Sequence, residues 1–499
     1  MSVLLSWEGI LALLLGGFYG AVFGAIPGLT ATLAVALFIP VAFFLDPIIA
    51  LPAIIAISSV AIYAGDVGSA VARIPGTPAS AAYLSELHRV ARRKGPFYGL
   101  GISAMGSAVG GIIGTILLIF SATTIATLAR QFSSFEYFWI AVLGLAAGIF
   151  ASGGSPIKAL VSLLLGLLMS TVGIDPTLGH PRFHFGSPDL LGGLNYIVAM
   201  IGLFGFSEVL EYIFNNKDEK YEAPEKVGGA AGQFYSKPLL LILREKWLVL
   251  RSSILGVFVG FLPGAGADIG AWVSTSFQQM KKKPNVEGEE VDDEEDDRII
   301  LAGTSSNNSA VASAWIPALS LGLPGDTVTA IVLGVFLMKG ITPGPLLFEQ
   351  QPDLLWSLYL TFLIANLVLL PLYGFLTARM AAFLIKVPFK LLLSFITGLC
   401  IVGAFAINNS LFDVWIMVGM GLVAFLLRRG GFPLAQVVLG MVLGPIMEQN
   451  FMVSAIKSKW DLMSFFERPL ALVLMAATVL VVFLGMRYRS RFRPQASTD

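Results

Sequence analysis

The sequence has little charge and almost no cysteine. Only 13% of its 499 residues are Asp, Glu, Lys or Arg, whereas 56% are hydrophobic; a soluble domain usually carries about twice that share of charge. The single cysteine, Cys400, excludes a disulfide framework and a cysteine-based metal site. No Ser/His/Asp, H-E-x-x-H or Walker arrangement is present either, so neither hydrolysis nor direct ATP coupling is supported. The zero net charge gives no sign of a nucleic-acid partner.

Long apolar runs are abundant instead. A bilayer core about 30 Å thick needs roughly 20 apolar residues per helical crossing. Runs of that size recur along the whole chain, for example at Phe97–Phe120, Leu354–Leu376, Leu391–Phe412 and Pro469–Met486. We therefore predict an all-α polytopic membrane protein.

The short basic segments indicate the topology. By the positive-inside rule, loops rich in Lys and Arg face the cytoplasm; they lie at 89–94, 237–251, 281–283, 379–390, 428–429 and 487–493. The stretches between them, at 123–134, 173–192, 340–353 and 447–467, are rich in Pro, Gly and Ser, and we place them outside. About eleven crossings follow, with the C-terminus in the cytoplasm.

Two segments do not fit simple crossings. The uncharged stretch between Glu8 and Asp46 is too long for one crossing and is interrupted at Pro27-Gly28. The chain between Arg251 and Lys281, both predicted to be cytoplasmic, is broken at Pro263-Gly264. Each is predicted to form a re-entrant hairpin, because irregular backbone at membrane depth must be buried in protein or face a watery cavity.

The chain contains a repeat in which the two hairpins are equivalent. Residues 20–28 and 256–264 share the pattern G-x-x-x-G-x-x-P-G, and the Pro-Gly pairs of 73–81 and 322–330 follow in the same order. In the first copy, a basic loop follows the second Pro-Gly break. In the second copy, a sparsely charged stretch follows the equivalent break. We therefore predict an inverted-topology repeat with two Pro-Gly-tipped re-entrant helical hairpins and two broken transmembrane helices.

The repeat predicts the domain organisation. The first inverted repeat spans 1–214 and the second 252–447, joined by a cytoplasmic linker at 215–251. The second contains an acidic cytoplasmic loop at 281–298, whose carboxylate run we expect to be solvated and disordered. A periplasmic loop, the last transmembrane helix and a basic tail fill 448–499.

The broken helices predict an anion site. A helix that starts inside the membrane has free backbone N–H groups and a positive local dipole. Small and hydroxyl residues follow each break and complete the predicted substrate site, which comprises Gly28, Thr30, Thr32, Gly76, Thr77, Gly264, Ala265, Gly266, Asn307, Asn308, Gly325 and Thr327. The alternative is that these small residues only allow close helix packing.

Acidic residues at depth are candidates for ion coupling. Asp268 and Asp326 suit a sodium ion or a transferable proton, although Asp326 is most simply a helix N-cap. Asp66 has Arg73 seven residues later on the same predicted helix, and mutual neutralisation of the two side chains is the equal alternative to a role in transport. The amides of Asn307 and Asn308 suit a carboxylate or a cation, with interhelical hydrogen bonding as the alternative. No metal or organic cofactor is predicted.

Several motifs resemble those of the large permease subunit of the tripartite tricarboxylate transporters. They are G-A-I-P-G-L-T-A-T at 24–32, V-A-R-I-P-G-T-P at 71–78, G-I-D-P-T-L-G-H-P-R-F-H-F-G at 173–186, I-G-L-F-G-F-S-E-V-L at 201–210 and F-L-P-G-A-G-A at 261–267. Asn307-Asn308, L-G-L-P-G at 321–325 and L-G-P-I-M-E at 443–448 complete the resemblance, which covers nearly the whole chain.

The resemblance implies a secondary transporter in the bacterial inner membrane. Such a protein works with a small four-helix membrane subunit and a periplasmic solute-binding protein, and imports di- or tricarboxylates driven by an ion gradient, with an elevator-like movement. The loop 173–192 is then the expected dock for the binding protein. The transported carboxylate, the choice of sodium or proton, and a homodimeric state stay open. A stand-alone organic-anion transporter or channel is the main alternative, and a membrane enzyme is a distant one.

Overall fold

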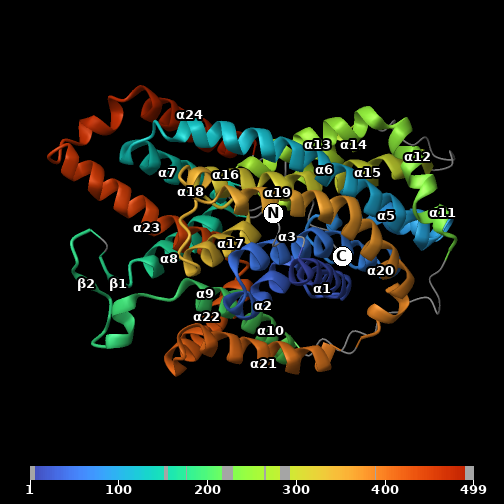
Figure 1. The fold of residues 1–499 in the computed structure, drawn as a ribbon, viewed down its shortest axis with the longest axis horizontal. Coiled ribbons are helices and arrows are strands. Elements are labelled where there is room, and N and C mark those ends of the chain that lie inside the picture. The colour runs from blue at the N-terminus through green and yellow to red at the C-terminus, as the bar shows by residue number, and fades with distance from the viewer. Residues whose placement is uncertain are drawn as a thin grey trace. The chain divides into compact units, whose positions relative to one another are not determined.

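The computed structural model describes residues 6–150, 155–175, 177–215, 229–262, 266–280, 293–387 and 389–488. These residues are mainly helical, and the only strands among them are the short antiparallel pair β1 (Gly173–Ile174) and β2 (Pro181–Arg182) (Figure 1). Eight helical segments are long and apolar enough to cross a membrane, and five shorter apolar helices accompany them. The predicted all-α polytopic class is therefore confirmed, whereas the count of about eleven crossings stays a prediction.

The described chain divides into two compact units, and each draws on both halves of the sequence. Unit 1 covers Met1–Thr127, Asn195–Leu262 and Gly266–Leu426. Its first elements are α1 (Trp7–Ala25), α2 (Ala31–Phe44), α3 (Pro47–Ala64), α4 (Asp66–Ala72), η1 (Ser80–Tyr83), α5 (Leu84–Lys94), α6 (Pro96–Ala129), α9 (Tyr196–Met200), the π-helical turn η3 (Ile201–Phe206) and α10 (Ser207–Asn215).

The remaining elements of unit 1 come from the second half of the chain. They are α11 (Ala231–Phe234), α12 (Ser236–Arg244), α13 (Lys246–Phe261), α14 (Gly266–Gln279), α15 (Asp293–Ser313), α16 (Trp315–Leu321), α17 (Thr327–Met338), α18 (Leu347–Gln350), α19 (Pro352–Ile364), the π-helical turn η4 (Ala365–Leu369), α20 (Leu370–Leu384), α21 (Phe389–Asn408) and α22 (Leu411–Arg429).

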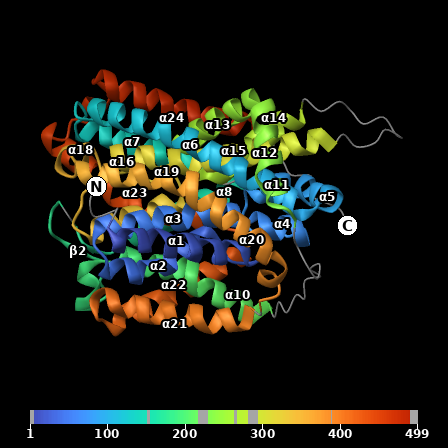
Figure 2. The same ribbon diagram turned by 45° about the vertical axis from the view of Figure 1, so that its right-hand side comes forward.

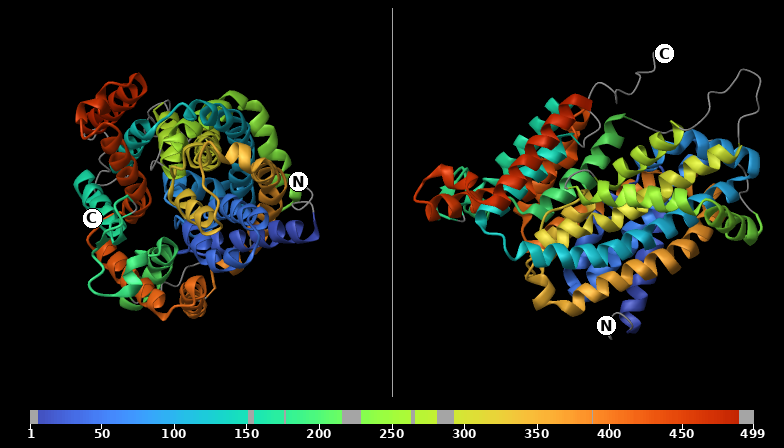
Figure 3. Two further views of the ribbon diagram at one scale, coloured as in Figure 1. Left: turned by 60° about the vertical axis from the view of Figure 1, so that its left-hand side comes forward. Right: turned by 90° about the horizontal axis from the view of Figure 1, so that it is seen from above.

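Unit 2 consists mainly of Leu128–Leu194 and Leu427–Asp499. It contains β1, β2, α7 (Ser134–Phe150), α8 (Pro156–Ser170), η2 (Pro188–Gly192), α23 (Leu434–Lys457), η5 (Leu462–Phe466) and α24 (Pro469–Tyr488). The red C-terminal helices lie beside the teal α7 and α8 in Figure 3, and α23 packs on both. An ion pair of 2.6 Å between Arg468 and the buried Glu136 joins α7 to the segment before α24.

Glycines set the arrangement of the first hairpin. Gly20 and Gly24 of α1 lie directly against the backbone of Ile57 and Ala61 in α3, with no room for a Cβ atom. From the first contact to the second, the contacting residue moves one turn toward the C-terminus on both helices. Hence α1 and α3 run in parallel, and they lie side by side in Figure 2. The α2 helix that connects them must therefore run back, as a hairpin requires.

The second hairpin has the same glycine contacts. Gly256 and Gly260 of α13 lie against the backbone of Ser306 and Ala310 in α15, again without room for a Cβ atom. Hence α13 and α15 run in parallel and α14 returns between them. The glycines are those of the repeated G-x-x-x-G-x-x-P-G pattern, which gives this pattern a direct packing role.

The segments after α3 and α15 also correspond. The helix α4 ends at Arg73 with φ 57°, and α16 ends at Gly322 with φ 72°, so both chains turn through the left-handed region. Behind these turns, Gly76 packs on Gly65 and Gly325 packs on Ala314. The two breaks thus share one local construction, while the inverted orientation of the copies stays a prediction.

The acidic run differs from its prediction. Residues 281–292 lie outside the described residues, but α15 begins at Asp293, so the predicted acidic loop to 298 ends earlier. Asp296 is 2.8 Å from Arg89 of α5, and Asp297 is 2.9 Å from Lys94. Both carboxylates are buried. Acidic residues favour the start of a helix, and these also neutralise basic α5, which explains why the end of the run is ordered.

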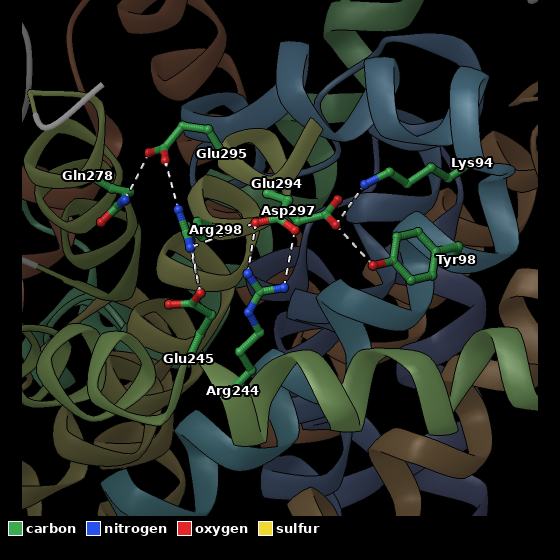
Figure 4. Close-up of polar contacts among 9 residues, drawn as sticks. All are labelled: Lys94, Tyr98, Arg244, Glu245, Gln278, Glu294, Glu295, Asp297 and Arg298. Carbon is green, nitrogen blue, oxygen red and sulfur yellow. Dashed lines mark hydrogen bonds and ion pairs between the residues drawn. The ribbon is translucent and has the colours of Figure 1, made fainter. Parts of the chain in front are cut away.

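A second set of pairs holds the same end of α15 to α12 and α13. Arg298 is 2.9 Å from Glu245, and Arg244 is 3.0 Å from Glu294 (Figure 4). The start of α15 is therefore tied to three other helices by charge, as the labelled side chains of Figure 4 show.

Two stretches predicted as loops are partly helical. Helix α6 continues to Ala129 and α23 continues to Lys457, so the predicted outside loops at 123–134 and 447–467, and the predicted periplasmic loop from 448, begin later. The sequence at 123–134 has no proline, and Pro445 before the second predicted boundary is accommodated inside α23. Hydroxyl groups of Thr123, Thr124 and Thr127 bond to carbonyls four residues earlier, within the helix.

The glycine contacts predict a position-dependent effect of adding one methyl group. Gly256→Ala places its Cβ atom against the backbone of Ser306, and overpacking of this kind usually costs about 1–3 kcal/mol. Gly419→Ala in α22 is the control, since nothing lies within 4 Å of its added Cβ atom. Thermal unfolding of the purified protein should show a lower Tm for Gly256→Ala and an unchanged or higher Tm for Gly419→Ala. Equal Tm values would contradict the glycine-dependent packing.

Candidate functional site

The first hairpin tip exposes the start of α2. The chain leaves α1 after Ala25 and turns at Gly28, which has φ 91° and is exposed. Thr30 is the N-cap of α2, and its hydroxyl accepts a hydrogen bond of 3.2 Å from the Leu33 amide. The predicted site residue Thr30 is therefore used by the helix itself.

The second hairpin tip leads into α14. The predicted residues Gly264 and Ala265 lie outside the described residues. Gly266, the first residue of α14, has φ 72°, and Asp268 follows in the first turn. A Cβ atom on Gly266 would lie 3.5 Å from the Cβ atom of Asp326, so this tip lies next to the second break of its own copy.

The starts of α2 and α14 meet between α3 and α15. Ala31 of α2 and Ala267 of α14 belong to one buried cluster with Ala61, Ile62, Ala310 and Val311. Two helices of fourteen residues thus begin beside each other in an apolar surrounding. The free N–H groups and positive ends of both helices therefore converge on one place.

A third helix starts at the same region. Asp326 is the N-cap of α17 and forms a capping box with Thr329, whose amide and hydroxyl both lie 2.7 Å from Asp326 Oδ1. The predicted capping role of Asp326 is confirmed. Its neighbour Gly325 is buried against Ala314 and has a packing role.

Each hairpin contacts the break of the other copy. The hydroxyls of Thr32 and Thr327 lie 3.1 Å apart, which joins the first turn of α2 to the first turn of α17. The Ala79 amide donates a hydrogen bond of 3.1 Å to Asp268 Oδ1, which joins α14 to the first-copy break. The structure thus brings together the predicted residues Thr32, Thr327 and Asp268 with segments far away in the sequence.

The break of the first copy is closed on itself. Thr77 is buried, and its hydroxyl accepts a hydrogen bond of 3.1 Å from the Ser80 amide. Ser80 returns the contact, because its hydroxyl donates to the Thr77 carbonyl at 2.8 Å. Gly76 packs against Gly65. These two predicted site residues therefore shape the turn.

Asp66 is held by hydroxyl groups. Tyr83 donates to its carboxylate at 3.0 Å, and Ser103 donates a further short hydrogen bond. Neutralisation by Arg73 is not found: within the described residues Asp66 forms no ion pair, and Arg73, which follows α4, is exposed. Asp66 is only 1% exposed and contacts neither hairpin tip through these bonds.

Asn307 and Asn308 lie on different faces of α15. Asn308 donates a long hydrogen bond of 3.5 Å to Asn366 of the π-helical turn η4. Asn307 is 2% exposed, and its Oδ1 atom has no hydrogen-bond partner within the described residues. A buried carbonyl oxygen without a partner is costly, so Asn307 is a candidate ligand residue.

The position of Asn307 relates it to the tips. Gly303, one turn before it, packs on Tyr83 and Thr275. Val311, one turn after it, belongs to the cluster that contains Ala31 and Ala267. Asn307 therefore lies on the face of α15 directed toward the starts of α2 and α14.

Sequence reasoning missed three residues of this region. Tyr83 and Ser103 hold Asp66, and the Trp272 indole donates to the Pro78 carbonyl at 3.0 Å. Trp272 lies one turn after Asp268 on α14, and this spacing is the signal that could have found it. Tyr83 and Ser103 carry no such signal, because only folding brings them to Asp66.

Comparison with known proteins gives a family match. A model of the Tripartite tricarboxylate transporter TctA family matches residues 10–439. An uncharacterized 52.8 kDa protein in the TAR-I ttuC' 3' region of Agrobacterium vitis is 32% identical over 476 residues, which cover 94% of this chain and 92% of the relative. An uncharacterized protein in the TAR-II ttuC' 3' region of the same organism is 31% identical over 236 residues, 46% of this chain and 93% of the relative.

Solved structures give no useful likeness. A manganese transporter mutant from Eremococcus coleocola is 12% identical and covers 80% of this chain and 95% of its own, but the TM-score is 0.11.

Proposed function

Because the chain belongs to the Tripartite tricarboxylate transporter TctA family of membrane transporters, we propose that it is the large membrane subunit of a binding-protein-dependent secondary transporter for di- or tricarboxylates. An ion gradient drives the uptake across a bacterial inner membrane. The observation that carries the proposal is the convergence of the α2 and α14 N-termini in one buried cluster.

The proposed solute site lies at these N-termini. Gly28 leaves the start of α2 open, and the hydrogen bond between the hydroxyls of Thr32 and Thr327 leaves one of their two protons free to donate to a carboxylate. Within the described chain, neither Asp268 nor Asp326 forms an ion pair with Lys or Arg. The positive potential for an anion therefore comes from backbone N–H groups, as at other helix N-termini.

The contacts of unit 1 support inverted copies. The Lys339 ammonium after α17 donates to the Phe43 carbonyl at 2.6 Å, so the end of α17 lies beside the end of α2, where α3 is about to begin. The start of α15, in contrast, is paired with α5, which follows the Pro-Gly break of the first copy. The start of α3 in the first copy therefore lies beside the end of α17 in the second copy. Likewise, the start of α15 in the second copy lies beside α5 in the first. Inverted repeats around a central site require this exchange.

We propose that one of the acidic residues of the same region couples transport to the ion. Asp268 lies in the first turn of α14, and Asp326 is the N-cap of α17. Either carboxylate can bind a sodium ion or accept a proton. Asp66 is a weaker candidate because two hydroxyl donors already occupy its carboxylate. Binding of cations beside the solute would reduce the charge that an elevator-like movement carries through the apolar surroundings.

The family description names three parts, and we propose the β-hairpin of unit 2 as the dock of the solute-binding protein. Phe183 and Phe185 both have φ 48° and are 51% and 84% exposed. Bulky residues in this left-handed region cost about 1–3 kcal/mol each and cluster at binding sites. Exposed aromatic side chains are also common anchors of protein interfaces.

The hairpin is held firmly. Arg182 donates to both oxygens of Glu448 on α23, one of them at 3.1 Å. The amides of Thr177 and Leu178 donate to Asp175 at 2.7 and 3.1 Å, and these bonds lower the pKa of Asp175 below its usual value. The Phe side chains are therefore presented by a fixed loop, which reduces the entropy lost on docking. The small four-helix subunit remains a partner inferred from the family.

A substitution at the first tip tests the solute site. Gly28→Val strains the backbone and blocks ligand approach, so the affinity for the transported carboxylate in proteoliposome uptake should fall about ten- to a hundredfold. Gly95→Val is the matched control, because Gly95 has φ 98° but nothing within 4 Å and no place at the tips. Wild-type affinity for Gly28→Val, or an equal loss for Gly95→Val, would place the site elsewhere.

A second substitution tests the dock. Phe185→Ser should weaken binding of the purified solute-binding protein about tenfold or more, while solute binding to the membrane chain itself stays unchanged. Met280→Ser is the control, since Met280 is 75% exposed at the predicted cytoplasmic end of α14. An unchanged Kd would exclude the hairpin as the dock. Uptake that needs no binding protein would favour the stand-alone transporter instead.

A further inference from the structure

The two hairpins differ in one side chain at equivalent positions. Thr32 and Asp268 each lie four residues after the glycine of the repeated Pro-Gly pair, in the first turn of α2 and α14. Both make the contact to the break of the opposite copy, Thr32 to Thr327 and Asp268 to the Ala79 amide. The equivalence is thus one of packing as well as of sequence.

This difference makes the two sides of the site chemically unequal. A threonine hydroxyl can donate a hydrogen bond to a carboxylate, whereas an ionised aspartate only accepts. Asp268 uses Oδ1 for the Ala79 amide, and within the described chain its Oδ2 atom has no hydrogen bond or ion pair. The side chain is half-buried, so this second oxygen is open to a ligand.

Two neighbouring groups support a ligand at this place. Gly266 lies against Asp326, so a second acid stands next to the Asp268 side of the site. Asn307, 2% exposed, has an unpartnered carbonyl oxygen on the face of α15 directed toward the same tips. Oxygen acceptors therefore gather on the α14 side, while hydroxyl donors gather at Thr32 and Thr327.

We propose that Asp268 selects carboxylates that also carry a hydrogen-bond donor, a hydroxyl or an ammonium group. The inference rests on the proposed carboxylate site and names the class of solute within it. A carboxylate of the solute lies at the start of α2, and the donor points to Asp268 Oδ2. A plain di- or tricarboxylate places a second negative group or a bare methylene against these acceptors and binds poorly.

Matched acids test the proposal on the full-length purified chain. Succinate, malate and aspartate share one four-carbon skeleton, and tricarballylate differs from citrate by one hydroxyl. Ligand-dependent thermal stabilisation should show malate or aspartate binding about tenfold or more tighter than succinate, and citrate likewise tighter than tricarballylate, as a hydrogen bond to a charged group predicts. Malate against aspartate distinguishes a hydroxyl from an ammonium donor.

Variants assign the preference to Asp268. Asp268→Asn keeps an acceptor for the Ala79 amide but replaces the free oxygen by an NH₂ donor, so the preference for the hydroxylated or aminated acid should fall to within about threefold or reverse. Asp353→Asn, at an exposed acid in the first turn of α19, is the control and should keep the wild-type ratio.

Three results would overturn the inference. Equal binding of the matched acids by the wild type would remove the selection, and an unchanged ratio in Asp268→Asn would assign it to another residue. An equal loss of affinity for every acid, together with lost sodium dependence, would make Asp268 a cation ligand. In each of these cases carboxylates still bind, whereas a chain that binds none of them would contradict the proposed function itself.

Discussion

The structure of unit 1 depends on how it buries the ends of broken helices. Inside an apolar phase a free N–H group costs several kcal/mol, so a helix may begin there only if protein or ligand atoms surround its start. Gly20 and Gly24, with Gly256 and Gly260, let α1 and α13 lie directly on α3 and α15. The starts of α2 and α14 are then enclosed between these helices. The proposed anion site uses this enclosure and needs no basic side chain.

The equivalent parts of the chain are used differently. The first copy closes its break with the Thr77–Ser80 turn, whereas the second caps α17 with Asp326. The hairpins carry a hydroxyl in one copy and a carboxylate in the other. A repeated frame with unequal side chains is what an asymmetric solute requires, since one end must meet donors and the other acceptors. The charged pairs at the start of α15 lie at the predicted cytoplasmic end and serve to join helices.

The sequence was most informative where a residue type has one physical use. The repeated glycines and Pro-Gly pairs predicted where helices pack closely and where they break, and Asp326 predicted its own capping role. It was less informative where the outcome depends on distant contacts. The helical end of the acidic run has no such signal, because the partners of Asp296 and Asp297, Arg89 and Lys94, lie about two hundred residues earlier. Arg73 looked like a partner of Asp66 because a left-handed turn at a non-glycine residue has no sequence signal. The ends of α6 and α23 were placed too early, because polar residues near a boundary do not stop a helix.

In the transport cycle that we propose, one site between the two copies opens alternately to the two sides of the membrane. A single cysteine at Thr327→Cys in a Cys400→Ser background measures this directly, by its reaction with a membrane-impermeant thiol reagent added on either side of oriented vesicles. We expect labelling from both sides, with protection on both when the transported carboxylate is bound. Labelling from one side only, unaffected by solute, would contradict it.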